Sequence, residues 1–227
     1  MARSGTWQVR LTPCRPVPAS WFPPVCDKDV LCLASGGGQQ GPLLAAAGAR
    51  VTVFDNSPRQ LAQDQSVSDR EGLSVELIRG DMRDLSPLGD ASFDLVVLPC
   101  ANCFVEDLGA LWSECARVLR AGGLLMSGFA NPLIFCFERR KERNGVLELH
   151  YSVPYSDVES LTAEERAEYL EHDEPLCFGH SLEAQIAGQL DAGFVITGFY
   201  EDYHEADDVT VAYFHAFIAT RAVRIGD

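Results

Sequence analysis

The chain has 227 residues, of which 47% are hydrophobic and 22% are charged, which suffices for a large core and excludes an intrinsically disordered chain. Its 33 acidic residues outnumber 18 Lys and Arg residues, and a formal net charge of −15 disfavours binding to nucleic-acid phosphates. No apolar run approaches the roughly 20 residues of a membrane span, and the start lacks an apolar signal segment, so the composition predicts a soluble cytoplasmic protein.

From residue 27 onward, short apolar runs alternate with helical stretches, a pattern typical of a parallel sheet covered by helices. The apolar runs predict strands at 30–33, 51–54, 75–78, 93–98, 124–129, 194–199 and 211–220. Caps and 3.6-residue periodicity predict helices at 43–47, 58–72, 108–119 and 181–192. The last two strands are joined without a helix and are therefore expected to be antiparallel.

These elements predict an α/β fold with a doubly wound, mostly parallel, seven-stranded Rossmann-like sheet and a C-terminal antiparallel strand. The regularity breaks at about residues 131–180, a segment too short to own a core, which is expected to be an inserted lid. Residues 1–26 precede the first strand and are expected to form an N-terminal arm. The remainder, 27–227, is expected to be one domain that carries the lid.

A glycine-rich segment, Ser-Gly-Gly-Gly-Gln-Gln-Gly at residues 35–41, follows the first strand and opens a helix; we call it the glycine turn. Glycines let a backbone approach a ligand closely, and helix amides there can point at it. Gly36, Gly38 and Gly41 match the dinucleotide pattern G-x-G-x-x-G, and Asp55 ends the second strand, where it can bind ribose hydroxyls. A nucleotide-type cofactor is predicted, and a tight turn without a ligand stays possible.

Further motifs resemble those of the class I S-adenosylmethionine-dependent methyltransferases from about residue 27 to the C-terminus. Residues 30–38 are similar to the first motif of that family, Gly80-Asp81-Met82 to its adenine-contacting pair, 93–97 to its fourth strand and 117–123 to its turn before the fifth. The resemblance implies S-adenosylmethionine as the cofactor of a methyltransferase domain over 27–227. Cys32 stands where the family usually has an acid, and Ala34 where it usually has a glycine.

The resemblance also implies where ligands bind, because ligands of such sheets lie beyond the carboxyl ends of the strands. The implied cofactor-binding residues are Ala34, Ser35, Gly36, Gly37, Gly38, Gln39, Asp55, Asn56, Asp81, Met82 and Pro99. The arm, the loop after the fourth strand and the lid are expected to supply the substrate-binding residues Trp21, Asn102, Tyr151 and Gln185. His180 and Tyr155 are the catalytic candidates, the first as a proton acceptor and the second to orient a substrate, although packing roles stay open for both.

Cys100 and Cys103 form a lone C-x-x-C without a second pair at zinc spacing, so no metal site is predicted and the thiols are expected to line the pocket. The predicted function is methyl transfer from S-adenosylmethionine to an unidentified small-molecule acceptor, with neither nucleic acid nor membrane as a partner. An NAD-dependent oxidoreductase and a non-catalytic, cofactor-binding regulatory protein are the alternatives. Neither the oligomeric state nor the group that replaces an acid at Cys32 follows from the sequence.

Overall fold

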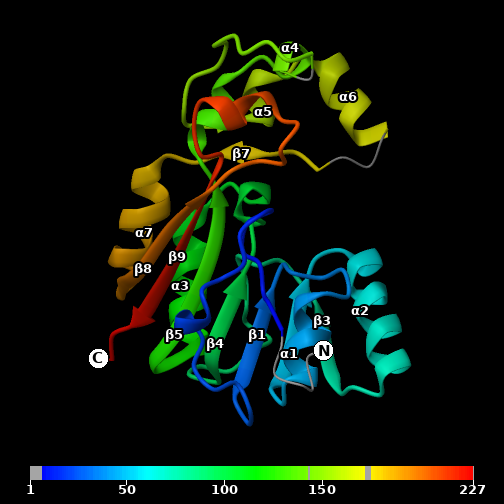
Figure 1. The fold of residues 1–227 in the computed structure, drawn as a ribbon, viewed down its shortest axis with the longest axis vertical. Helices are drawn as coiled ribbons and strands as arrows, with labels where there is room; N and C mark the ends of the chain where they lie inside the picture. Colours follow the sequence, from blue (N-terminus) through cyan, green and yellow to red (C-terminus); the bar gives the residue numbers. More distant parts are fainter. Residues whose placement is uncertain (1–6, 143, 172–174, 227) are drawn as a thin grey trace.

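The structure, a computed structural model, describes residues 7–142, 144–171 and 175–226. Seven strands form one sheet in the order β3-β2-β1-β4-β5-β9-β8 (Figure 1). The strands are β1 (Asp29–Leu33), β2 (Arg50–Asp55), β3 (Val75–Arg79), β4 (Phe93–Leu98), β5 (Leu119–Ala130), β8 (Phe194–Asp202) and β9 (Phe217–Arg224). The first five pair in parallel, whereas β9 is antiparallel to both β5 and β8. The predicted fold class is confirmed.

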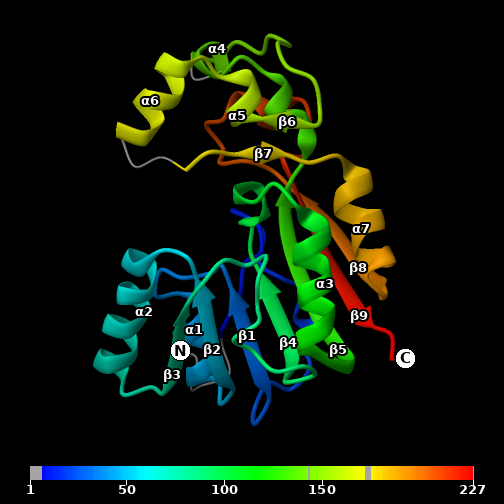
Figure 2. The same ribbon diagram turned by 180° about the vertical axis from the view of Figure 1, so that it is seen from behind.

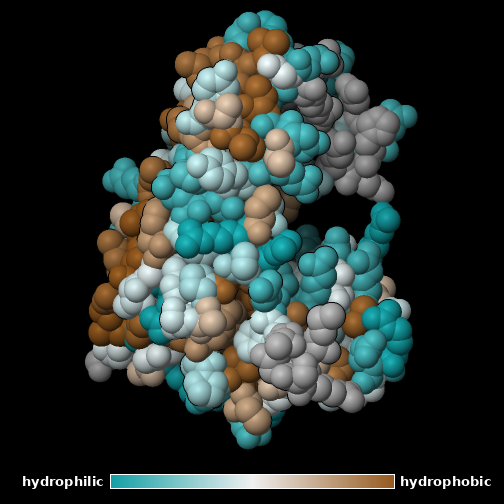
Figure 3. Space-filling model, in the orientation of Figure 1, coloured by the Kyte–Doolittle hydropathy of each residue, from teal (hydrophilic) through white to brown (hydrophobic). Residues whose placement is uncertain are grey.

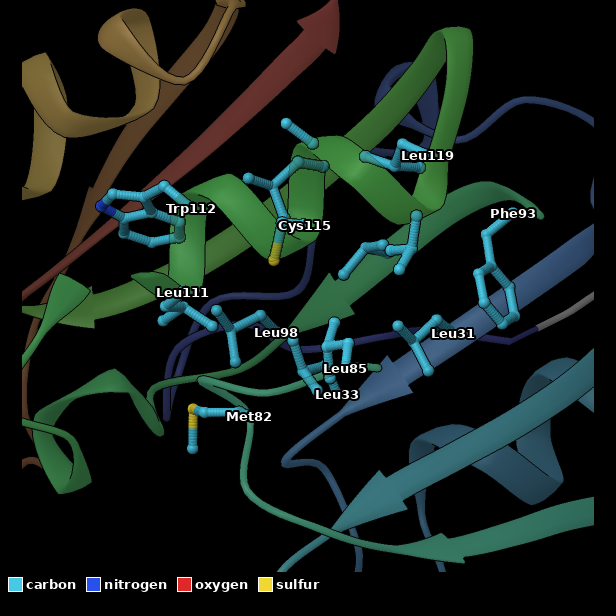
Figure 4. Close-up of a cluster of buried hydrophobic side chains, with 14 of the residues drawn as sticks. Leu31, Leu33, Met82, Leu85, Phe93, Leu98, Leu111, Trp112, Cys115 and Leu119 are labelled. Atoms are coloured by element: carbon cyan, nitrogen blue, oxygen red, sulfur yellow. The ribbon is translucent and has the colours of Figure 1, made fainter. Parts of the chain in front are cut away.

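Helices and the arm cover both faces of this sheet, so β1 is buried on both sides. One apolar cluster joins Leu31 of β1 to Trp112 (Figure 4), and the other joins Val30 to Leu44 and to residues of the arm. Because successive side chains of a strand point to opposite faces, neighbouring residues of β1 enter different clusters. The helices concerned are α1 (Gln40–Ala46), α2 (Pro58–Glu71), α3 (Leu108–Val118) and α7 (Gly188–Asp191).

The starts of the long helices follow the caps that the sequence predicts. The Ser57 hydroxyl accepts a hydrogen bond from the Gln60 amide at 3.3 Å, and the Asp107 carboxylate accepts one from the Ala110 amide at 3.2 Å. At the other end of α2, Gly72 takes a left-handed conformation (φ 63°) that favours glycine. Local chemistry therefore sets these boundaries.

The arm crosses the sheet and includes the 3-10 turn η2 (Ala19–Trp21). Val9 and Leu11 are buried. The Leu11 carbonyl accepts a hydrogen bond from the Cys100 amide at 3.2 Å, and a Cβ on Gly128 of β5 would collide with the same carbonyl. The arm is thus packed into the domain next to the carboxyl end of β4.

The lid lies beyond the carboxyl ends of the parallel strands, with α4 at its far end and α6 at its side (Figures 1 and 2). Its two short strands β6 and β7 pair antiparallel with each other rather than with the main sheet. The lid elements are η4 (Pro132–Cys136), α4 (Arg139–Glu142), β6 (Tyr155–Ser156), α5 (Asp157–Ser160), α6 (Ala163–Glu171) and β7 (Phe178–Gly179). No helix in the described ranges is long and apolar enough to cross a membrane.

The predicted last strand is wrong over its first half, because β9 begins only at Phe217. The residues before it form the 3-10 turn η6 (Val209–Ala212), where the Asp208 side chain accepts a hydrogen bond from the Thr210 amide at 2.8 Å. An aspartate that caps its own turn competes with strand formation. Strand β5 also starts earlier than predicted, at Leu119, since that residue pairs with Phe93 of β4.

The helix predicted at 181–192 is interrupted by a π-helical turn, η5 (Glu183–Ala187), before α7. The indole Nε1 of Trp112 donates to the Ala184 carbonyl at 3.1 Å. That carbonyl would otherwise accept the Gly188 amide in an α-helix, and the Gly188 amide bonds instead to the Glu183 carbonyl. A tertiary contact thus shifts the helical register.

Candidate active site

The glycine turn joins β1 to α1 and rests against α2. A Cβ on Gly36 would lie 2.7 Å from the Cβ of Gln60 and 2.9 Å from an oxygen of Asp55. Gly37 (φ 122°) and Gly38 (φ 75°) adopt conformations that other residues rarely take. The turn therefore requires glycine for its own packing, in addition to any close approach of a ligand.

Asp55 lies at the end of β2 with both carboxylate oxygens oriented by the backbone. Oδ2 accepts a hydrogen bond from the Gly36 amide at 3.0 Å, and Oδ1 accepts one from the Ser57 amide at 2.8 Å. Each oxygen can accept a further hydrogen bond, because a carboxylate has about four acceptor sites. A pre-oriented, half-buried carboxylate of this kind could bind two neighbouring hydroxyls.

The two departures from the family motif have clear structural settings. Ala34 has a positive φ of 46°, the conformation that favours the glycine the family usually has there. Cys32 is buried inside the sheet, and burial raises the pKa of its thiol to about 12 although the Ser35 hydroxyl lies beside it. The thiol therefore stays neutral and supplies no negative charge at this position.

The ends of β2 and β4 flank the end of β1, and the end of β3 lies one strand further out, beyond β2. They bring Asn56, Asp81 and Pro99 to the same edge as the glycine turn. The Asp81 carboxylate binds Arg83, with Nη2 2.6 Å from Oδ2, and this bond lowers the pKa of Asp81. Met82 is buried in the apolar cluster of Figure 4, so its side chain packs against the domain.

A cavity of about 650 Å³ borders the glycine turn on the side of the arm. Gln39, which is exposed, and Gly38 line it from the turn. Arg10 lines it from the arm, and the backbone carbonyl of Arg10 accepts a hydrogen bond from the Gln40 side chain at 3.0 Å. The arm thus contacts the start of α1.

Two predicted substrate residues contact each other. The Asn102 amide nitrogen donates to Oε1 of Gln185 at 2.7 Å, and both side chains are buried. Gln189 donates to the Gln185 carbonyl at 2.8 Å and accepts from Thr220 at 3.1 Å. This network joins the loop after β4, at η3 (Asn102–Phe104), to η5 and β9. It holds that loop in place, and a substrate contact by Asn102 or Gln185 stays a prediction.

His180 follows β7 and contacts the backbone of the loop after β4. Its Nε2 lies 2.9 Å from the Val105 carbonyl oxygen. Burial lowers the pKa of His180 below its usual value of 6.5, although the Val105 and Asn102 carbonyls oppose that shift. The ring is therefore neutral near pH 7 and connects the lid to the loop. Its predicted role as a proton acceptor is untested by this geometry.

Tyr155 is buried inside the lid, where its hydroxyl donates to Oδ1 of Asp157 at 2.7 Å. Its ring stacks on Phe135 and meets Tyr151 edge-on, with centroids 5.8 and 5.0 Å away. Asp157 also accepts the Cys177 amide at 2.6 Å. Tyr151 is half-buried at the rim of this group. The two predicted tyrosines thus share one aromatic cluster, and their contact with a substrate stays a prediction.

None of the eight cysteines forms a disulfide. Cys100 and Cys103 lie together in the loop after β4, and the thiol of Cys103 also contacts that of Cys177 in the lid; this contact and burial raise the pKa of Cys103. Burial raises the pKa of Cys100 to about 12. The described residues contain no group of His, Cys, Asp and Glu placed to hold a metal ion.

Trp21 lies on a different part of the molecule from the other predicted site residues. It packs against Gly198, in the middle of β8, and its ring is tilted on Tyr200 at 5.2 Å. Its backbone carbonyl accepts from Arg221 of β9 at 3.1 Å. The side chain is buried in the second apolar cluster, and a role in substrate binding stays a prediction.

A cavity of about 430 Å³ lies between the lid and the segment that joins β8 to β9; we call it the lid cavity. The same face is hollowed between the lid and the side of the molecule that carries α2 (Figure 3). One wall of the lid cavity is Cys177, which contacts Cys103 of the loop after β4. The lining residues are Ile134, Phe135, Glu142, Cys177, His204, Asp208 and Thr210.

Sequence reasoning missed Asp64, a buried carboxylate whose Oδ2 accepts the Gly37 amide at 2.8 Å. It lies on α2 in phase with Leu61 and Ser68, three residues after one and four before the other. Helical phase could have marked it as inward-facing. That spacing does not reveal that the residue meets the glycine turn.

Comparison with known proteins agrees with this geometry. A family model described as a methyltransferase domain matches residues 31–127, which include the glycine turn and Asp55. The uncharacterized methyltransferase YbaJ of Bacillus subtilis is 51% identical over 224 residues, covering 99% of this chain and 87% of that protein. A probable S-adenosylmethionine-dependent methyltransferase of Mycobacterium tuberculosis is 34% identical over 108 residues, covering 48% of this chain and 38% of that protein.

Solved structures share the fold. An S-adenosylmethionine-dependent methyltransferase from Mesorhizobium loti superposes with a TM-score of 0.69 at 18% identity, covering 90% of this chain and 94% of that one. A putative one from Listeria monocytogenes gives 0.67 at 16% identity, covering 91% and 95%. The nearly full-length similarity to YbaJ, the domain match and this fold together establish that the chain belongs to the class I S-adenosylmethionine-dependent methyltransferases.

Proposed function

We propose that this methyltransferase acts on a small molecule that binds in the lid cavity, while the cofactor binds at the carboxyl ends of β1 to β4. The supporting observation is the position of the cavity. Its wall at Cys177 contacts Cys103 in the loop after β4, next to the edge of the sheet where the family motifs lie. Its volume of about 430 Å³ is within the range of roughly 300–1,000 Å³ typical of small-molecule sites.

Membership of this family implies S-adenosylmethionine as the cofactor and methyl transfer as the reaction. It disfavours the alternatives of an NAD-dependent oxidoreductase and a non-catalytic regulatory protein. The residues at the edge of the sheet fit this group. Asp55 presents two oriented oxygens that suit the ribose hydroxyls, and the Gly36 amide places the glycine turn directly beside it. We assign the other predicted residues at the ends of β2, β3 and β4 to the same site. Bound S-adenosylmethionine supplies an electrophilic methyl group on its sulfonium.

The protein's own contribution is then positioning and exclusion of water, which can supply several kcal/mol of the barrier to such a displacement. His180 and Tyr155 serve this role through the lid. The first joins the lid to the loop after β4, and the second bonds to Asp157, which in turn holds the backbone of Cys177 just before β7. We assign both as residues that position the acceptor.

The electrostatics of the cavity favour a small acceptor over a nucleic acid. Glu142 and Asp208 line it, and the chain as a whole has a formal net charge of −15. A polyphosphate backbone would be repelled from this entrance. A neutral or positively charged small molecule would not be repelled.

A labelled methyl donor tests the proposal. The protein is incubated with radiolabelled S-adenosylmethionine and with separate low-molecular-weight, protein and nucleic-acid fractions of a cell extract. We expect label in the low-molecular-weight fraction. Label that entered only the protein or nucleic-acid fraction would contradict the small-molecule assignment.

A matched pair of variants tests the location. Ile134→Trp places a bulky ring in the lid cavity, whereas Leu133→Trp alters a neighbouring residue that is 46% exposed and lies outside the cavity lining. We expect the first variant to bind S-adenosylmethionine normally but to lose most of its transfer, and the second to retain both. Equal transfer by the two variants would place the acceptor elsewhere.

A further inference from the structure

Asp64 is a fully buried charged side chain in the middle of α2 that no step proposed above uses. Its Oδ2 accepts the Gly37 amide at 2.8 Å, and the Gly38 amide also lies close enough to act on it. Its Oδ1 is buried without a hydrogen-bond partner in the part of the chain that the structure describes. An ionised carboxylate loses its hydration on burial, so burying Asp64 makes the free energy of folding less favourable.

Asp64 contacts the section of the glycine turn whose backbone conformation is least common. Gly37 and Gly38 both have positive φ. A Cβ on Gly38 would lie 2.8 Å from a methyl of Val67 and 3.2 Å from the Gln63 carbonyl oxygen, so the turn is pressed onto α2. A backbone in this region persists only where its surroundings hold it. The Asp64 carboxylate supplies that hold from behind the turn.

The successive amides of the turn are thus shared between two carboxylates. Gly36 donates to Asp55 at the end of β2, and Gly37 donates to Asp64 on α2. Strand β1, by contrast, offers only the neutral thiol of Cys32 on this side of the sheet. The carboxylate that meets the Gly37 amide therefore comes from α2 and not from β1.

We propose that Asp64 is a positioning residue for the cofactor, holding the glycine turn from α2 in the shape that binds S-adenosylmethionine. This inference rests on the assignment of the glycine turn to the cofactor site. On this proposal, Asp64 contributes to cofactor binding and not only to the stability of the fold. Because burial raises the pKa of Asp64, its ionised form opposes folding near pH 7, and removing the charge should not lower stability there.

Three variants test the proposal by calorimetric titration with S-adenosylmethionine and S-adenosylhomocysteine and by thermal unfolding without ligand. Asp64→Asn keeps the shape but loses the charge, Asp64→Ala also removes the acceptor, and Asp69→Asn makes the same charge change at an exposed site of α2. We expect affinity to fall about fivefold for Asp64→Asn and at least tenfold for Asp64→Ala, and to be unchanged for Asp69→Asn. The unfolding temperature of Asp64→Asn at pH 7 should equal or exceed that of the parent.

Parental affinity in Asp64→Asn would overturn the inference, as would a loss of affinity matched by a lower unfolding temperature, since that marks a purely structural role. If Asp64→Ala does not fold, Asp64→Asn alone decides. Failure of the parent chain to bind either ligand would instead remove the cofactor-site assignment, and this inference with it. The two failures are therefore distinguishable.

Discussion

At the scale of single residues, three carboxylates near the glycine turn have different partners and therefore different chemistry. Asp81 is bound to Arg83, which lowers its pKa and occupies both of its oxygens. Asp64 is buried and directed at a backbone amide. Asp55 accepts one amide on each oxygen and stays partly exposed. Of the three, Asp55 has the geometry to accept hydroxyls from a ligand.

Asp55→Ala should weaken cofactor binding by roughly tenfold or more, because a hydrogen bond to a charged group contributes about 1.5–3 kcal/mol. The substitution also leaves the Gly36 and Ser57 amides without their acceptor. Calorimetric titration with S-adenosylhomocysteine measures the loss. Arg59→Ala, at an exposed position of the adjacent helix, is the control and should bind normally. A folded Asp55→Ala protein with parental affinity would refute the assignment.

Cysteine reactivity should follow exposure, because the thiolate is the reactive form and buried thiols are neither ionised nor accessible. Burial raises the pKa of Cys32 and Cys115 to about 12, whereas Cys14 and Cys26 are exposed. Alkylation with iodoacetamide at pH 8, followed by mass spectrometry, should label the exposed pair first. Cys32 and Cys115 should react only in denaturant. Early labelling of Cys32 would show that β1 opens in the native state.

At the scale of elements, the arm is attached to the far edge of the sheet by one carboxylate. Oδ2 of Asp202, at the end of β8, accepts the amides of Cys14 at 2.9 Å and Arg15 at 2.7 Å. The Arg15 guanidinium lies over the Tyr200 ring, 4.6 Å from its centroid. Because Arg10 in the same arm contacts Gln40 of α1, the arm connects β8 to the start of the cofactor site.

Asp202→Ala should release the arm and lower the free energy of unfolding by about 1.5–3 kcal/mol, because two part-buried hydrogen bonds lose their charged acceptor. Urea unfolding measures the loss. Hydrogen exchange at the Val17 amide, which bonds to the Val9 carbonyl, reports the arm directly. Asp207→Ala, at an exposed acid of the following turn, should change neither quantity. An arm still protected in Asp202→Ala would mean that apolar packing alone holds it.

The same contact predicts a pH dependence. Burial acts to raise the pKa of Asp202, but hydrogen bonds from the Arg15 amide, the Thr12 hydroxyl and the Cys14 amide outweigh it and lower the pKa below 3.8. A depressed carboxyl pKa stabilises the fold above the unfolded value, and that stabilisation disappears as pH falls through the folded value. Val17 protection should therefore persist at pH 5 and decline below pH 3.8. Loss at pH 5 would contradict the assignment.

At the scale of the whole molecule, the lid and the sheet are joined by contacts that come from distant parts of the chain. His180 bonds to the loop after β4, Cys177 touches Cys103, and the β8–β9 segment closes the lid cavity from the other side. The residues proposed to bind the cofactor lie at or after the ends of β1 to β4, and these strands lie on the other side of this boundary from the lid (Figure 1). Cofactor binding and acceptor binding should therefore respond to different substitutions.

His180→Ala and Tyr155→Phe should leave S-adenosylmethionine affinity within about twofold of the parent and lower methyl transfer about tenfold, because each removes one hydrogen bond that holds the lid. Titration measures the first quantity, and labelled transfer to the identified acceptor measures the second. Tyr213→Phe, at a tyrosine that is 73% exposed, is the matched control. Parental transfer by both lid variants would move the acceptor site towards Trp21 and the arm.

Elements with local signals could be read from the sequence, because neighbouring residues determine them. The apolar run at 93–98 is buried strand β4, and Ser57 and Asp107 cap the helices that follow them. Where a tertiary contact competes, the local signal fails. The Trp112 indole binds the Ala184 carbonyl, which an uninterrupted α-helix would use for its own hydrogen bond. Strand β9 begins at Phe217 because its pairing with β5 begins there.

The sequence by itself determined the fold class, the cofactor and the edge of the sheet at which the glycine turn and Asp55 meet, because parallel strands bring their carboxyl ends together. Only the tertiary structure decided which polar side chains remain available there. Asn102 is paired with Gln185, 83 residues away, and Asp64 faces the glycine turn from a helix whose sequence shows only its inward phase. Hydrogen bonds between residues so far apart in the chain depend on how the elements pack, and no local pattern of residues encodes them.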